Sequence, residues 1–261
     1  SGGAFVALAP ATLRCAMERF SRLTPSLPVV VFVVGTGSLG AEIAAARMLA
    51  PYFGASTLIW ANTIGIVLVA LSAGYWYGGK RADRDPTPRG LFKIVLVAGL
   101  LTAAIPFVAD PFLGVAVDAL DSISAGAFVG SLLGVLILIA TPVFVMGMVA
   151  PYALRLAVHG VEDTGRTSGR LYAISTIGSL SGNFASALVL IPLVGTRRTF
   201  LVFALGFVIV AVLGLPSRKL LLAPVGIIVL MALPVGIVKA ADDPGERVLT
   251  EIDTTYQYAR V

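Results

Sequence analysis

Seven long apolar stretches dominate this sequence and constrain its fold more than any other feature. Each is long enough, or nearly so, to cross about 30 Å of hydrocarbon at about 1.5 Å per helical residue. They lie at 27–49, 55–78, 91–109, 125–147, 168–194, 199–215 and 219–239. Every backbone N–H and C=O group in lipid needs a partner within the chain, so these stretches are predicted to be helices. We expect an all-α membrane protein, a polytopic bundle of about seven transmembrane helices with a short β-like C-terminal tail.

Composition excludes several classes of protein. The chain is 57% hydrophobic and 13% charged, whereas a typical soluble domain is about 45–50% apolar and about 25% charged. This argues against an ordinary soluble domain, a disordered chain and a nucleic-acid-binding domain. The expected partner is the lipid bilayer, and the net charge of +5 is attributed to basic loops facing an anionic leaflet. Cys15 is the only cysteine and His159 the only histidine of the sequence, so we expect no disulfide within the chain and no Cys/His metal site.

The placement of Lys and Arg predicts the direction of insertion. With a cytoplasmic N-terminus, 13 of the 19 basic residues fall inside and five outside, with Arg47 near an outer helix end. The inside residues are Arg14, Arg19, Arg22, Lys80, Arg81, Arg84, Arg89, Lys93, Arg155, Arg166, Arg170, Arg218 and Lys219. Seven spans from an inside start put the C-terminal tail outside. The alternatives are a re-entrant stretch, or two helices in the region that holds Pro142 and Pro151.

Three regions are expected along the chain: 1–25, 26–240 and 241–261. The first contains a short cationic stretch, Thr12–Leu23, with apolar residues at helical spacing. It is either an amphipathic helix lying on the membrane surface or a tail without fixed structure. The second region is the transmembrane bundle. The third is polar and Thr-rich, with β-like runs at 247–252 and 255–261. Two strands cannot hold themselves together in water, so the third region either joins a partner sheet or begins a soluble domain.

Two charged residues in the first span are candidate polar sites. Glu42 lies well within the span and Arg47 ends it. An ionisable residue in a span is costly unless it is paired. The two are five residues apart and so about 140° apart around a helix, which makes them poor partners for each other. Glu42 is therefore expected either to fix helix packing through another helix or to serve a substrate-related role.

Small and polar residues mark the fifth span. Gly178, Gly182 and Ser186 recur every four residues, a spacing that lets helices approach closely. The main expectation is helix packing. Tyr172 and Asn183 on the same span are candidate residues for lining a polar cavity.

The segment G-G-K-R-A-D-R at 78–84 resembles the short G-x-x-A-D-R signature of major facilitator transporters. In that signature the glycines allow a tight turn, and the Asp and Arg latch neighbouring helix ends on the cytoplasmic side. The resemblance implies a cytoplasmic latch at Gly79, Asp83 and Arg84. The alternative is a plain basic loop.

A longer set of motifs resembles one family. The first-span pattern is E-x4-R-x-L-A-P-x-F-G-x-S-x3-W, beginning at Glu42, and G-G-K-R-A-D-R follows it. P-V-F-V-M-G-M-V-A-P-Y at 142–152, G-R-L-Y-A-I-S-T-I-G-S-L-S-G at 169–182 and E-I-D-T-T-Y-Q-Y-A-R-V at 251–261 complete the set. Over 26–261 the chain looks like the membrane part of the membrane-bound spermidine-synthase-like proteins, a facilitator-like bundle fused to a polyamine aminopropyltransferase-like domain.

The resemblance implies a soluble domain with a β-rich entry region and a Rossmann-like fold. Tyr256 and Gln257 match a Y-Q pair of that entry region, and Gln257 is implied to lie near the donor, decarboxylated S-adenosylmethionine. The chain ends at Val261, so the Gly-rich donor loop and the amine-binding acidic residues are absent from it, and no catalytic residue is assigned within it. The charge count places this tail outside, where the donor is not normally supplied. Either the topology differs by one span or the domain does something other than synthesis.

Three functions remain open at this stage. The first, which the resemblance implies, is that the chain is the membrane domain of a spermidine-synthase-like protein and would anchor and supply a transferase-like domain. Alternatively it transports a small solute or polyamine, with Glu42 as a cation site; seven spans would then require a homodimer. A third reading is a structural subunit of a larger membrane complex, docked through its tail.

Overall fold

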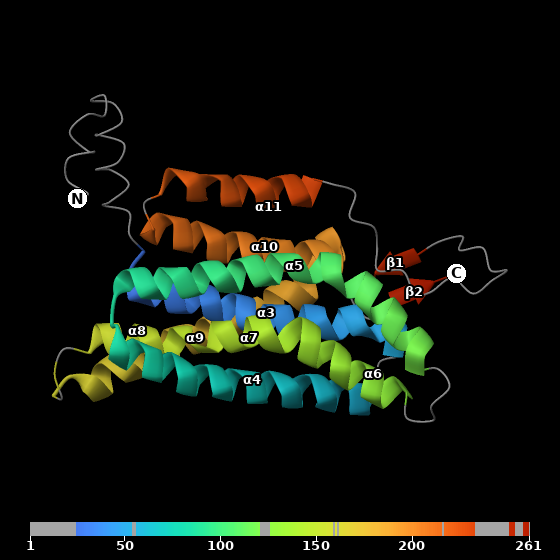
Figure 1. Ribbon diagram of the computed structural model, residues 1–261, viewed down its shortest axis with the longest axis horizontal. Helices are drawn as coiled ribbons and strands as arrows, with labels where there is room; N and C mark the ends of the chain where they lie inside the picture. Colours follow the sequence, from blue (N-terminus) through green and yellow to red (C-terminus); the bar gives the residue numbers. More distant parts are fainter. Residues whose placement is uncertain are drawn as a thin grey trace.

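Helices make up almost all of the described chain (Figure 1). The computed structural model describes residues 25–53, 56–120, 126–158, 160, 162–215, 217–232, 251–253 and 258–260. The helices are α3 (Leu27–Phe53), α4 (Thr57–Arg84), α5 (Pro88–Leu120), α6 (Gly126–Gly134), α7 (Ala140–Gly147), α8 (Val149–Ala157), α9 (Thr164–Ala185), α10 (Ile191–Gly214) and α11 (Leu222–Ala232). Strands β1 (Glu251–Asp253) and β2 (Tyr258–Arg260) form a two-stranded antiparallel sheet at one end of the bundle. The expected amphipathic stretch 12–23 lies outside the described residues.

The expected helical bundle is confirmed, and the expected number of seven spans is not. Five helical segments of the described chain are long and apolar enough to cross a membrane. Two expected spans, 168–194 and 199–215, run on as one 51-residue helical segment, Thr164–Gly214. The stretch at 219–239 is described only as α11, whose 11 residues are too short to span alone. The region of Pro142 and Pro151 belongs to a single candidate span, Phe128–Ala157.

The long segment Thr164–Gly214 folds back on itself. Gly195 has φ +82° and ψ 164°, a backbone conformation that breaks a helix and that glycine adopts without strain. Contacts with α3 show the reversal. Along α9, Gly178 lies against Phe32 and Gly182 against Thr36, so α9 runs parallel to α3. Along α10, Phe207 lies against Gly37 and Phe203 against Gly40, so α10 runs antiparallel to α3.

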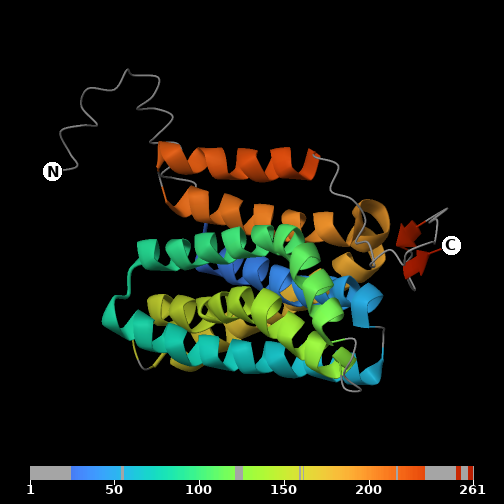
Figure 2. The same ribbon diagram turned by 45° about the vertical axis from the view of Figure 1, so that its right-hand side comes forward.

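Proline explains the irregular turns of the two segments that depart from α-helical geometry. A proline cannot donate to the carbonyl four residues earlier and its ring clashes with that carbonyl. Wider π-helical turns occupy Val135–Ile139, just before Pro142, and Ser186–Leu190, just before Pro192. Helix α5 carries Pro106 and Pro111 and bends at its far end (Figure 2). It continues to Leu120, so it extends 11 residues beyond the apolar stretch expected at 91–109.

Helix α3 lies at the centre of the bundle and contacts α4, α5, α9 and α10. Its residues enter two of the buried clusters. One is built around Phe92, Tyr152 and Phe207, and the other around Met48 and Phe200. Inside a bilayer no hydrophobic driving force brings helices together, because the lipid tails are as apolar as the side chains. Close van der Waals packing therefore has to hold such a bundle together. The small residues of α3, α4 and α9 provide that packing.

Candidate functional site

Helices α3 and α9 cross closely. A Cβ atom at Gly178 or at Gly182 would overlap the backbone carbonyl oxygen of Phe32 or of Thr36, respectively. One turn later the Ser186 hydroxyl donates a hydrogen bond of 2.8 Å to the Gly40 carbonyl. The prediction that these small residues bring two helices together is therefore confirmed. Backbone carbonyls of α3 act as acceptors across the crossing.

A polar crevice opens beside this crossing, between α3, α4, α9 and the junction of α7 and α8. Its volume is about 70 Å³, enough for a few water molecules. Its polar lining comes from Ser38, Tyr75, Ser175 and Ser179, and the Ser179 hydroxyl donates to the Gly35 carbonyl at 3.2 Å. The crevice has hydroxyl groups but no charged residue in its lining, so in this conformation it suits water or an uncharged polar group.

The two cavity candidates of α9 lie near this crevice but do not line it. Tyr172 is 55% exposed and lies in the neighbourhood of Tyr75. Asn183 is partly buried, four residues beyond Ser179 and therefore on the same side of α9. Both therefore follow the side of α9 that carries Ser175 and Ser179, and neither lines the crevice.

Glu42 lies on the same face of α3 as the floor of the crevice. Gly35, Ser38 and Glu42 are spaced by three and four residues, so they follow one stripe of the helix. Glu42 is partly buried, and within the described part of the chain its carboxylate has no hydrogen bond or ion pair. It forms no ion pair with Arg47, in agreement with the angle between them. Arg47 is partly buried near the C-terminal end of α3 and interacts with a different group.

The expected cytoplasmic latch is a helix end rather than a glycine turn. Helix α4 continues through Gly78 and Gly79 to Arg84, and the turn comes only at Asp85–Thr87. Gly78 packs against the backbone of Met148, where a Cβ would lie 2.6 Å from the carbonyl oxygen. Gly79 has room for a Cβ, 4.0 Å from the nearest atom. The expectation that these glycines form a tight turn is wrong, because the close approach of α4 to α8 is what requires glycine, and it does so at Gly78.

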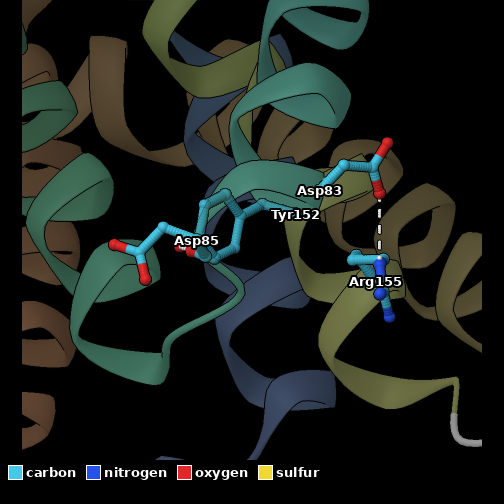
Figure 3. A network of polar contacts seen from close by, with 4 residues as sticks. All are labelled: Asp83, Asp85, Tyr152 and Arg155. Atoms are coloured by element: carbon cyan, nitrogen blue, oxygen red, sulfur yellow. Dashed lines mark hydrogen bonds and ion pairs between the residues drawn. The ribbon is translucent and has the colours of Figure 1, made fainter.

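Polar contacts do join α4 to α8 at this end (Figure 3). Asp83 pairs with Arg155, whose Nε lies 3.1 Å from the carboxylate oxygen. Both side chains are largely exposed, 72% for Asp83 and 50% for Arg155. Arg84 is exposed in the last turn of α4, where the partial negative charge at the C-terminal end of the helix dipole stabilises a positive side chain.

Tyr152 is a contact that the sequence reasoning missed. Its hydroxyl donates a 2.5 Å hydrogen bond to the Asp85 carbonyl and accepts one of 3.3 Å from the Thr87 backbone N–H. The side chain is 1% exposed, so both bonds are shielded from water. It therefore fixes the α4–α5 turn onto α8. The signal was the Tyr that closes P-V-F-V-M-G-M-V-A-P-Y, since a buried tyrosine usually has a hydrogen-bond partner for its hydroxyl.

The remaining site predictions fall outside the described residues or concern metals. The resemblance implied that Tyr256 and Gln257 lie near the donor. Both fall between β1 and β2, outside the described residues. Among the described residues, no group of three or more His, Cys, Asp or Glu side chains lies close enough to hold a metal ion.

Comparison with known proteins adds no further constraint. No family model, curated protein or solved structure matches this chain.

Proposed function

We propose that this chain is the membrane domain of a spermidine-synthase-like protein and anchors a soluble transferase-like domain that begins in the 241–261 region. The observation that carries this proposal is the hairpin of β1 and β2, in which Glu251 is opposite Arg260 and Asp253 opposite Tyr258. A two-stranded hairpin is marginally stable at best in water. Further strands are therefore needed to complete the sheet, and a soluble domain would supply them.

A seven-pass topology is part of this proposal. The opposite directions of α9 and α10 along α3 support two crossings by the segment Thr164–Gly214. Helix α11 lies within the last apolar stretch, packs against α10 and would belong to the seventh crossing. Figure 2 places the hairpin at the opposite end of the bundle from the start of α3. A cytoplasmic N-terminus then puts the hairpin outside.

Aromatic residues near the inner end of α4 support the proposed inner interface. Tyr75, Trp76 and Tyr77 are all exposed, as expected of side chains at the level of lipid headgroups. The Lys80 ammonium lies 3.6 Å from the centre of the Trp76 ring, a cation–π contact at the same level. Beyond them lie the basic residues Arg81 and Arg84 of the helix end.

Aminopropyl transfer belongs, in this proposal, to the soluble domain and to its donor, decarboxylated S-adenosylmethionine. The intact mass of the protein isolated from its own cells tests the anchor function. We expect a mass above the 27.0 kDa of this chain by a domain of roughly 100–200 residues. A mass equal to 27.0 kDa would refute the anchor function and favour transport or complex assembly.

Solute transport is a second candidate because of Glu42. An unpaired carboxylate in a transmembrane helix costs free energy, and such residues commonly mark ion or substrate pathways. Its stripe on α3 leads directly to the crevice at Ser38 and Gly35. The crevice volume of about 70 Å³ is too small for a polyamine, so transport would require α4 and α9 to separate.

Uptake by sealed vesicles containing the purified protein separates the two functions. The test compares Glu42→Gln with Glu162→Gln, the same chemical change at an exposed residue of the α8–α9 turn. A transporter loses most spermidine uptake in Glu42→Gln alone, with the melting temperature unchanged. Loss of thermal stability without any effect on uptake would assign Glu42 to helix packing.

A further inference from the structure

A second hollow lies at the inner end of the bundle, where α3 and α9 begin and α8 ends. Its volume is about 590 Å³, within the usual size range of ligand pockets. The polar lining consists of Arg166, Thr167 and Arg170 of α9. The apolar lining includes Leu27, Pro28 and Leu171. We refer to these six residues as the inner arginine pocket.

The inner arginine pocket is electropositive. Arg166 and Arg170 are four residues apart and so lie on one face of α9. Arg166 lies in the first turn of that helix, where the helix dipole adds partial positive charge, and Arg170 lies one turn further on. Asp163 pairs with the Arg166 guanidinium at 2.8 Å, with both side chains well exposed. Arg170 has no ion pair with any other residue that the structure describes, so its guanidinium is available to an anion.

The depth of the pocket selects the kind of anion. Leu27 is the first residue of α3, and Leu171 is buried between the helices. The pocket therefore spans the level at which apolar helix surface gives way to charged residues. A free phosphate ion would use the arginines but leave the apolar floor against water. An anionic phospholipid would place its phosphate on the guanidinium groups and its acyl chains along the floor.

We propose that the inner arginine pocket binds the phosphate of an anionic phospholipid from the leaflet at this end of the bundle. The contact is charge-assisted, from Arg170 and from Arg166 when it exchanges Asp163 for the phosphate, with Thr167 as a further hydroxyl donor. The lipid would fix the beginning of α9 against the beginning of α3. This site is separate from both functions proposed above, since it involves neither the hairpin nor Glu42.

Purified full-length chain in nanodiscs tests the site. The discs contain phosphatidylcholine with 0–40 mol% phosphatidylglycerol, and the melting temperature and the lipids retained on the protein in native mass spectrometry are measured. We expect phosphatidylglycerol to be retained in preference to phosphatidylcholine and to raise the melting temperature. The double variant Arg166→Gln/Arg170→Gln should raise the half-saturating phosphatidylglycerol fraction at least threefold.

A matched variant controls for the general attraction of basic residues to an anionic leaflet. Arg81→Gln/Arg89→Gln removes the same charge at the same end of the bundle, from exposed residues outside the pocket. This control should stay within a factor of two of the wild type. An equal shift in both double variants, or no preference for phosphatidylglycerol in the wild-type protein, would overturn the proposal. Equal stabilisation by inorganic phosphate in phosphatidylcholine discs would assign the pocket to a free anion instead.

Discussion

Replacing Gly182 by alanine tests the close crossing of α3 and α9. The added Cβ would overlap the Thr36 carbonyl oxygen and lie 2.6 Å from the carbonyl carbon, whereas ordinary contact begins at 3.4 Å. These are backbone atoms of α3, which cannot rotate away as a side chain can. The two helices therefore have to separate by about 1 Å, which forfeits about a quarter to a half of each van der Waals contact across the crossing.

The expected cost is that of an overpacked interface, about 1–3 kcal/mol of unfolding free energy. The 2.8 Å hydrogen bond from Ser186 to Gly40 would lengthen with it. A chain of this size loses about 2–4 °C of melting temperature per kcal/mol. We therefore expect Gly182→Ala to melt several degrees below the wild type in detergent, measured by circular dichroism at 222 nm.

Gly169→Ala is the matched control on the same helix. A Cβ there meets nothing within 4 Å, and alanine favours a helix over glycine by up to about 1 kcal/mol. The control should be unchanged or slightly stabilised. If Gly182→Ala melted at the same temperature as Gly169→Ala, the close backbone contact between α3 and α9 at Gly182 would be refuted.

Three further substitutions test the remaining contacts. Tyr152→Phe removes both hydrogen bonds to the α4–α5 turn and should cost about 1–3 kcal/mol; faster hydrogen exchange at the Thr87 amide would show it, and an unchanged rate would contradict it. Asp83→Asn breaks an ion pair whose members are 72% and 50% exposed. The free energy of unfolding, measured by denaturant titration, should therefore fall by no more than about 1 kcal/mol. Ser186→Ala removes a bond between helices worth about 0.6 kcal/mol on average. Ser181→Ala is its control, because that hydroxyl bonds only within its own helix, to the Ile177 carbonyl at 2.8 Å; equal losses in the two serine variants would argue against the bond to Gly40.

Hydrophobicity and residue size carried the successful predictions from sequence. The first four apolar stretches correspond to helical spans because the backbone must pair internally in lipid. Gly178, Gly182 and Ser186 correctly indicated a close crossing, because small residues four apart leave one face of a helix open to a neighbouring backbone. The partner helix was not predictable, because spacing on one helix carries no information about which neighbour it meets.

The failures arise where one local pattern has two physical readings. The glycines at 78–79 fit either a turn or a close packing face, and only the position of Met148, between α7 and α8, decides for packing. Likewise, the interval between the apolar stretches that end at 194 and begin at 199 fits an ordinary loop. In the structure the helix is interrupted at Gly195 alone. Tyr152 was missed because its partners, backbone groups of Asp85 and Thr87, carry no side-chain signal in the sequence.

The most direct test of the seven-pass arrangement is the sidedness of Ser217, an exposed residue between α10 and α11. In a Cys15→Ser background, Ser217→Cys is treated with a membrane-impermeant maleimide in intact cells and again after permeabilisation. Thr57→Cys serves as the outside reference and Glu162→Cys as the inside reference, both at exposed residues. If Thr164–Gly214 crosses twice, Ser217→Cys is labelled only after permeabilisation, as Glu162→Cys is. Labelling of Ser217→Cys in intact cells, as for Thr57→Cys, would mean a single crossing and would contradict the seven-pass account.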